Sequence, residues 1–151
     1  MPHQNIFRRI LFCTDFSVHA DAAFIYALNI AEGNPESELI IFHVVPEPNA
    51  QFWKSYIYEI DKIDEKAKGD IDRRIEQSYL SRIPDGVSWS TLHAVGNMSQ
   101  KIFETAIEQK IDLVIIGREG RNRLRSLFFE NTAEKLARKA QTPVLIIPEP
   151  E

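Results

Sequence analysis

Apolar residues along the chain alternate between short continuous runs and segments with helical spacing. Five runs have the length of buried strands and end near turn residues, at 10–13, 38–45, 87–95, 113–116 and 144–147. In four intervening segments an apolar residue recurs at every third or fourth position, which predicts helices near 20–31, 51–81, 98–109 and 133–140. Strands that alternate with helices in this way predict a parallel sheet covered by helices on both faces, a three-layer α/β fold.

This pattern leaves two details of the helices open and predicts the position of one strand in the sheet. Either Asp15 or Ser17 is positioned to cap the first helix, since both side chains accept hydrogen bonds from free amides at a helix start. Gly69 lies in the middle of segment 51–81 and argues against a straight, unbroken helix there. The run 87–95 alternates with polar residues, which is typical of a strand at the edge of a sheet.

Length and composition fit one globular domain spanning 1–151. Of the 151 residues, 44% are hydrophobic and 26% charged, and no apolar run approaches the ~20 residues that span a bilayer. The formal net charge of −4 argues against general binding to DNA or RNA. Cys13 is the only cysteine, so neither an internal disulfide nor a cysteine metal site is expected, and residues 1–9 lack the features of a secretory signal. We therefore expect a cytoplasmic protein.

The residues that directly follow the strands are the first candidates for function. In open parallel sheets, ligands bind beyond the carboxyl ends of the strands, where the strand order reverses. Here those positions are held by Asp15, Val44, Gly96 and Gly117. A ligand contact and a helix cap explain Asp15 equally well.

The segment from Gly117 to Thr132 has the features of a phosphate site. Gly117 and Gly120 allow the backbone to approach a ligand closely, and the following helix start offers free amides. The segment is positively charged through four arginines, Arg118, Arg121, Arg123 and Arg125. A solvated surface turn explains the two glycines equally well, so the spacing alone does not decide between these interpretations.

Four motifs, in order along the chain, resemble the universal stress protein family. They are residues 10–17 (ILFCTDFS), the pair His43 and Val44, residues 112–120 (DLVIIGREG) and residues 142–147 (TPVLII). The resemblance spans about residues 6–148 and depends on the ordered set. It implies an adenine-nucleotide-α-hydrolase-like, Rossmann-like fold with five parallel strands and four helices, a cytoplasmic location, frequent homodimers and, in one branch, ATP binding.

The resemblance also implies a nucleotide site, but one with a departure from the family pattern. The nucleotide-binding branch has Gly-x-x-Gly, nine residues, then Gly-Ser or Gly-Thr. Gly117 and Gly120 match the first half, whereas Glu130 and Asn131 stand in place of the second. Asp15 and Val44 match positions that hold the base and ribose end. The implied site therefore consists of Asp15, Val44, Gly117, Gly120, Arg121, Arg123, Glu130, Asn131 and Thr132.

Glu130 changes the electrostatics of that site. Two unit charges ~4 Å apart repel by about 4 kcal/mol at an effective dielectric near 20, and a third of this is already a tenfold loss of affinity. Asn131 is also placed to cap the last helix, with Glu134 in a capping-box-like position. Glu130 would then supply the negative charge that a phosphate supplies elsewhere. The neighbouring arginines could instead offset Glu130 and retain a phosphate.

Enzyme chemistry has little support in the sequence. The four histidines show no metal-ligand spacing, His43 is predicted to be a packed strand residue, and Cys13 a buried apolar one. Trp53, Tyr56 and Tyr58 either cover the core or form a partner surface. No P-loop, dinucleotide fingerprint, nucleophile elbow or Ser-Gly-Gly-x-Asp-Ser loop is present. We therefore expect no catalysis, no metal and no resident cofactor.

Taken together, the residues and the resemblance predict a universal-stress-protein-like regulatory module with impaired or absent ATP binding. The alternative is an adenine-nucleotide-binding stress sensor that uses Asp15, Val44 and the glycine–arginine loop. A slow ATP-hydrolysing enzyme ranks third, because no general base is visible. The resemblance also implies a homodimer through the last strand, Val144 to Ile147, whose flanking prolines limit the pairing to a few residues.

Overall fold

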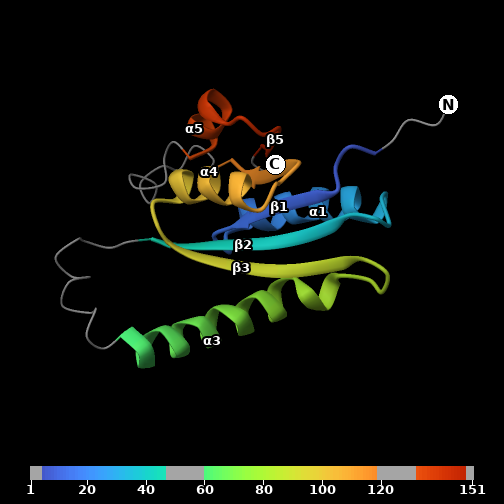
Figure 1. The fold of residues 1–151 in the computed structure, drawn as a ribbon. Helices are drawn as coiled ribbons and strands as arrows, with labels where there is room; N and C mark the ends of the chain where they lie inside the picture. Colours follow the sequence, from blue (N-terminus) through green and yellow to red (C-terminus); the bar gives the residue numbers. More distant parts are fainter. Residues whose placement is uncertain (1–4, 47–59, 119–131, 149–151) are drawn as a thin grey trace.

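The computed structural model describes residues 5–46, 60–118 and 132–148 (Figure 1). Its strands are β1 Arg9–Thr14, β2 Glu38–Pro46, β3 Ser88–Gly96, β4 Leu113–Gly117 and β5 Val144–Ile147. Its helices are α1 Val18–Glu32, α3 Ile60–Ser78, α4 Met98–Glu108 and α5 Thr132–Lys139, with a short 3₁₀ turn η1 at Leu80–Arg82. All five predicted strands and four predicted helices are present, so the predicted α/β class is confirmed.

The strands form one parallel sheet in the order β3-β2-β1-β4-β5. The polar run that was predicted to be an edge strand is β3, and it does lie at one edge, while β5 lies at the other. The chain builds outward from β1 through β2 to β3 and then returns to place β4 on the other side of β1. The strand order therefore reverses between β1 and β4.

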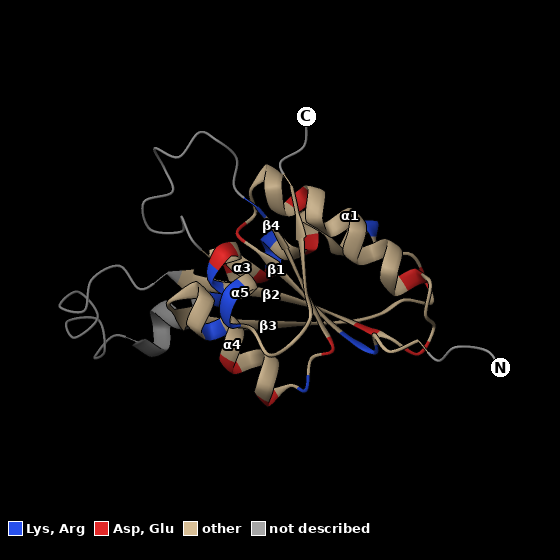
Figure 2. Ribbon diagram, turned by 90° about the horizontal axis from the view of Figure 1, so that it is seen from above, with Lys and Arg blue, Asp and Glu red and all other residues tan. Residues whose placement is uncertain are grey.

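Two hydrophobic cores, one on each face of the sheet, hold the three layers together. Side chains such as Phe12 and Ile41 pack against α1 and α3, whereas Leu11 and Phe42 pack against α4 and α5. This division follows from the strand geometry, because successive side chains point to opposite faces. Among Lys, Arg, Asp and Glu, the described strands contain only Arg9 and Glu38, both at strand starts, and the other charges of the described residues lie outside the strands (Figure 2).

A polar network at the amino ends of the strands fixes the start of the central strand, β1. Asp112 accepts hydrogen bonds from the backbone amides of Arg8 and Arg9, at 3.0 and 2.9 Å. The Arg9 guanidinium donates to the Glu38 carboxylate at 2.8 Å and to the Gln109 carbonyl at 2.6 Å. These bonds join β1 to β2 and to the end of α4, so the strand that leads to the candidate site is anchored at its start.

Both open details of the helix pattern are settled. Ser17 caps α1, since its side chain accepts a hydrogen bond from the Ala20 amide. Asp15 does not; its carboxylate accepts from the Ser17 amide at 2.9 Å, one step before the helix. The argument from Gly69 against an unbroken helix is wrong for the described part of segment 51–81, because α3 continues through it. A Cβ atom added at Gly69 would meet no neighbouring atom within 4 Å, so the helix has room for a side chain at this position.

Candidate functional site

The strand order brings Asp15, Val44 and Gly117 together at the carboxyl ends of three neighbouring strands, β1, β2 and β4. Cys13 of β1 is in register with Ile116 of β4, so Asp15, directly after β1, and Gly117, the last residue of β4, lie at the ends of neighbouring strands at the point of reversal. Val44 lies on the other side of β1, in β2. In open α/β sheets this is where ligands bind. The predicted residues Gly120, Arg121, Arg123, Glu130 and Asn131 lie outside the described residues, and Thr132 is the first residue of α5.

Asp15 is exposed at this edge, in a turn whose shape is fixed on both sides. The next residue, Phe16, has a φ of +64°, a left-handed conformation that side chains other than glycine seldom adopt. Its backbone amide donates to the Thr14 hydroxyl at 2.9 Å. Asp15 thus lies between Thr14, the last residue of β1, and Phe16, whose backbone has an uncommon conformation.

Thr14 is the residue that ties this turn to the rest of the molecule. Its hydroxyl shares a hydrogen bond of 2.5 Å with the Tyr79 hydroxyl, at the end of α3. Its carbonyl accepts a hydrogen bond of 2.8 Å from Nδ1 of His43, which must be the donor because a carbonyl only accepts. Thr14 and Tyr79 are both buried. The position of Asp15 therefore depends on two elements, β2 and α3, that the motif comparison did not connect with it.

Burial shifts the titration of three groups near this edge. It lowers the pKa of His43 below its ordinary value of 6.5, an effect to which the nearby charges of His93 and Arg74 also contribute. Burial likewise raises the pKa of the Tyr79 hydroxyl. It raises the pKa of the Cys13 thiol so far that a reactive thiolate is not accessible, as expected for a buried apolar residue.

Gly117 is required by packing as well as by any ligand. A Cβ atom at this position would lie 2.3 Å from the backbone oxygen of His19 and 2.6 Å from its carbonyl carbon. The end of β4 therefore passes directly against the first turn of α1, and no side chain fits between them. The side chain of Val44 is buried in the core under α4 and α5, so only its backbone is available to a ligand at the carboxyl ends of the strands.

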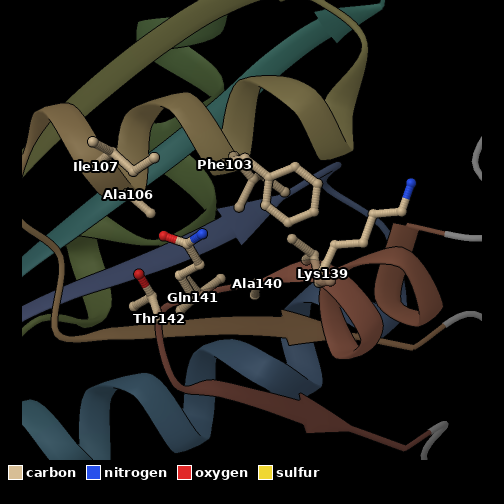
Figure 3. Close-up of a pocket in the computed structure, with 10 residues that line it drawn as sticks. Phe103, Ala106, Ile107, Lys139, Ala140, Gln141 and Thr142 are labelled. Carbon is tan, nitrogen blue, oxygen red and sulfur yellow. The ribbon is translucent and has the colours of Figure 1, made fainter.

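A cavity of about 140 Å³ lies elsewhere, between α4 and α5 (Figure 3). Phe103, Ala106 and Ile107 line it from α4, and Lys139 lies at its α5 side. None of the candidate residues at the carboxyl ends of the strands lines this cavity, and beyond helical spacing the sequence pattern does not predict it.

Within the described ranges, no group of three His, Cys, Asp or Glu side chains could hold a metal ion. The aromatic residues Trp53, Tyr56 and Tyr58 lie outside the described residues.

The comparison with known proteins identifies the family. A model of the universal stress protein family matches residues 6–148, so the chain belongs to that family. Universal stress protein MJ0577 of Methanocaldococcus jannaschii is 21% identical, over 94% of this chain and 95% of that protein.

Solved structures show the same fold at low sequence identity. That of MJ0577 superposes with a TM-score of 0.74 at 23% identity and covers 97% of this chain and 99% of that one. UspA from Lactobacillus plantarum has a TM-score of 0.69 at 22% identity, over 95% and 99% of the two chains. A universal stress protein solved in complex with cAMP has a TM-score of 0.60 at 21% identity, over 95% and 98%. In the parts that the structure describes, no helix is both long and apolar enough to cross a membrane.

Proposed function

We propose that this chain is a cytoplasmic regulatory member of the universal stress protein family that works as a homodimer through protein contacts. In this proposal it catalyses no reaction, needs no cofactor and does not bind ATP tightly. The observation that carries the proposal is the pair Glu130 and Asn131, at the place where the nucleotide-binding branch has Gly-Ser or Gly-Thr. The acidic side chain of Glu130 opposes a triphosphate, and Asn131 lacks the hydroxyl that Ser or Thr would donate to it.

The packing of Gly117 supports the same proposal. The first glycine of the Gly-x-x-Gly pattern has a structural reason in this fold, since a side chain there would meet the backbone of His19. Its presence is therefore expected whether or not a phosphate binds. The partial match to the nucleotide motif can persist in a member of the family that has lost ATP.

An adenine-nucleotide sensor is the second candidate, and one specific observation favours it. Asp15, Val44 and Gly117 do meet at the reversal of strand order, and a relative with the same fold was solved in complex with cAMP. A cyclic nucleotide carries a single phosphate, so Glu130 would oppose it less than it opposes a triphosphate. The two candidates therefore differ in whether any nucleotide binds, and in which one.

Titration with nucleotides separates the candidates. We expect no saturable binding of Mg-ATP in the micromolar range to the native protein, measured by calorimetry. The double variant Glu130→Gly with Asn131→Ser should bind Mg-ATP at least tenfold more tightly, because it removes the repulsion and restores the hydroxyl. A parallel titration with cAMP tests the sensor. Micromolar binding of ATP by the native protein would overturn the proposal, as would a double variant with unchanged affinity.

The arginines supply a control for that gain of affinity. If they hold the phosphates in the double variant, adding Arg121→Ala or Arg123→Ala should weaken binding and reduce its dependence on salt. An affinity that ignores both arginines and salt would mean that the double variant binds ATP in some other way.

The proposed dimer is tested at the β5 edge. The carbonyls of Pro143 and Ile147 accept hydrogen bonds from the β4 side, so the alternate residue Ile146 presents its backbone N–H to the open edge. Ile146→Pro removes that donor without removing a bond to β4 and should weaken dimerisation at least tenfold in sedimentation equilibrium. Ile146→Ala loses the same apolar side chain but keeps the N–H, and should remain dimeric. A native monomer, or a proline variant that dimerises as well as the alanine variant, contradicts this interface.

A further inference from the structure

Helix α1 is apolar on its outer side as well as on the side that packs against the sheet. Val18, Ile25 and Tyr26 are large hydrophobic residues, yet they are 69%, 56% and 51% exposed. Asp21 and Glu32 are the only Lys, Arg, Asp or Glu residues in this helix of 15 residues. Helices that are hydrophobic all round are typically buried all round. The composition of α1 therefore indicates a partner on its outer side.

Both charged residues of α1 lie on one flank. Successive residues are about 100° apart round a helix, so Asp21 and Glu32 differ by only about 20°. Arg82 of η1 pairs with Asp21, so this flank faces η1 and the end of α3. Tyr26 lies about 140° from Asp21, on the opposite flank. The residues that share this Tyr26 flank include no Lys, Arg, Asp or Glu; they are His19, Ala22 and Ile30.

The Tyr26 flank faces the β5 side of the sheet. Helix α1 packs over β1 and β4 and shares a hydrophobic core with Leu145 and Ile147 of β5. Helix α3, on the other flank of α1, lies along β3 at the far end of the strand order (Figure 1). Among the described residues β5 pairs only with β4, and its first three side chains are only partly buried. The Tyr26 flank and this open strand edge therefore adjoin each other.

Gly117 fixes the level of α1 along the strands. It lies against the backbone of His19, in the first turn of α1. Leu145 is in register with Ile115, two residues before Gly117 and thus about 6.6 Å down the strands. The same length of helix holds roughly four to five residues at about 1.5 Å each. Leu145 therefore lies level with the turn of α1 that contains Ala22 and Tyr26.

We propose that α1 packs against α1 of a second copy of this chain, with Ala22 and Tyr26 at the contact. This inference rests on the proposed homodimer through β5, to which it adds a contact between helices. One two-fold axis beside Leu145 serves both contacts, because Leu145 is level with the Ala22 and Tyr26 turn. The axis makes the two helices antiparallel, so that opposite ends of their dipoles come together.

The same axis gives β5 a complete strand pairing. The carbonyls of Pro143 and Ile147 accept bonds from β4, so Val144 and Ile146 direct their backbone N–H groups to the open edge. An axis beside Leu145 pairs Val144 of one copy with Ile146 of the other, which uses both donors of each strand. The two Leu145 side chains point to the face that α1 covers, so they meet beneath the helices.

The width of the dimer seam fits the residues of the Tyr26 flank. Adjacent strands lie about 4.8 Å apart, so the two β4 strands are roughly 14 Å apart, with two β5 strands between them. Helices in direct contact lie about 8–10 Å apart, so helices over the two β4 strands leave about 4–6 Å between their surfaces. The Tyr26 rings fill this gap. Tyrosine is enriched, and charge depleted, at the centre of protein interfaces, as on this flank.

Sedimentation equilibrium of a matched pair of variants tests the helix contact. Tyr26→Arg places a charge in the seam and should raise the dissociation constant of the dimer at least tenfold. Trp89→Arg makes the same change at an aromatic residue of β3 that is 46% exposed, and should associate as the native protein does. Separated subunits of Tyr26→Arg should unfold as native subunits do, because the side chain is exposed there.

Chemical cross-linking supplies a second test, independent of affinity. Cys13 is the only native cysteine and is buried, so a cysteine introduced at the surface is the one that reacts. Tyr26→Cys should be linked to its copy by a short bismaleimide, whereas Trp89→Cys should not. Mass spectrometry of the linked peptides identifies the site.

The outcomes separate the helix contact from the strand pairing. A native monomer overturns both. If Ile146→Pro weakens the dimer but Tyr26→Arg does not, and Tyr26→Cys stays unlinked, the strand pairing stands and the helix contact is wrong. If Tyr26→Arg weakens the dimer and Ile146→Pro leaves it intact, the helix contact is supported and the strand pairing is wrong.

Discussion

Gly117→Ala should destabilise the protein by about 3 kcal/mol or more, the upper end of the cost of overpacking a closely packed position. The added Cβ would lie 2.3 Å from the His19 oxygen, and both sides of that contact are backbone. No side-chain rotation can relieve it, so β4 must move away from the first turn of α1. That movement would also disturb the register of β4 with β1 and β5. The midpoint of urea unfolding, with the m-value held constant, measures the cost.

Gly69→Ala is the matched control, because it makes the same chemical change in a place without neighbours. Nothing lies within 4 Å of the added methyl group, and the residue is inside α3. Alanine is favoured over glycine by up to about 1 kcal/mol in a helix interior, so this variant should be slightly more stable. Equal effects of the two substitutions would mean that the close approach of β4 to α1 is not a constraint. A destabilised Gly117→Ala in the absence of nucleotide would show that the residue has a role independent of any ligand.

The fold was accessible from the sequence because each element is defined by a local signal. Apolar runs such as 113–116 can be buried on both faces only in a parallel sheet, and the helical segments between them leave few alternatives for the topology. The prediction at Gly69 was wrong since one unfavourable residue cannot break a helix whose apolar face packs through Ile71 and Ile75. Helix stability comes mostly from such packing rather than from intrinsic propensity.

The candidate site was predictable only in part, for a different physical reason. The expectation that the carboxyl ends of parallel strands lie together placed Asp15, Val44 and Gly117 near one another, and the strand order confirms this placement. It could not reveal that Thr14 bonds to Tyr79, which is 65 residues away, or that His43 holds the Thr14 carbonyl. Those contacts depend on the angle at which α3 crosses the sheet, and no periodicity encodes that angle. The same holds for the clash that makes Gly117 necessary.

Tyr79→Ala should destabilise the protein by about 3–5 kcal/mol, the range for removing a large buried aromatic side chain. Tyr79 is 1% exposed, and its ring contacts Phe12 and Phe24 at centroid distances of 5.1 and 4.9 Å. Its loss would leave a cavity between α1, α3 and β1 that these aromatic rings cannot fill by rotation. Because native proteins are stable by only about 5–15 kcal/mol, such a change removes a large share of the total. Thermal and urea unfolding measure it.

Tyr79→Phe divides that cost into its two sources. It keeps the ring and removes only the hydroxyl, which leaves the buried Thr14 hydroxyl without its partner directly after α3 and should cost about 1–3 kcal/mol. Tyr26→Ala is the control, since this tyrosine of α1 is 51% exposed and its removal should change stability by at most about 0.5 kcal/mol. If Tyr79→Phe were neutral, the hydroxyl bond would not be what holds Thr14. The anchoring of the Asp15 turn would then fall to His43 and Phe16 alone, and α3 would act on the carboxyl edge only through the packing of its rings.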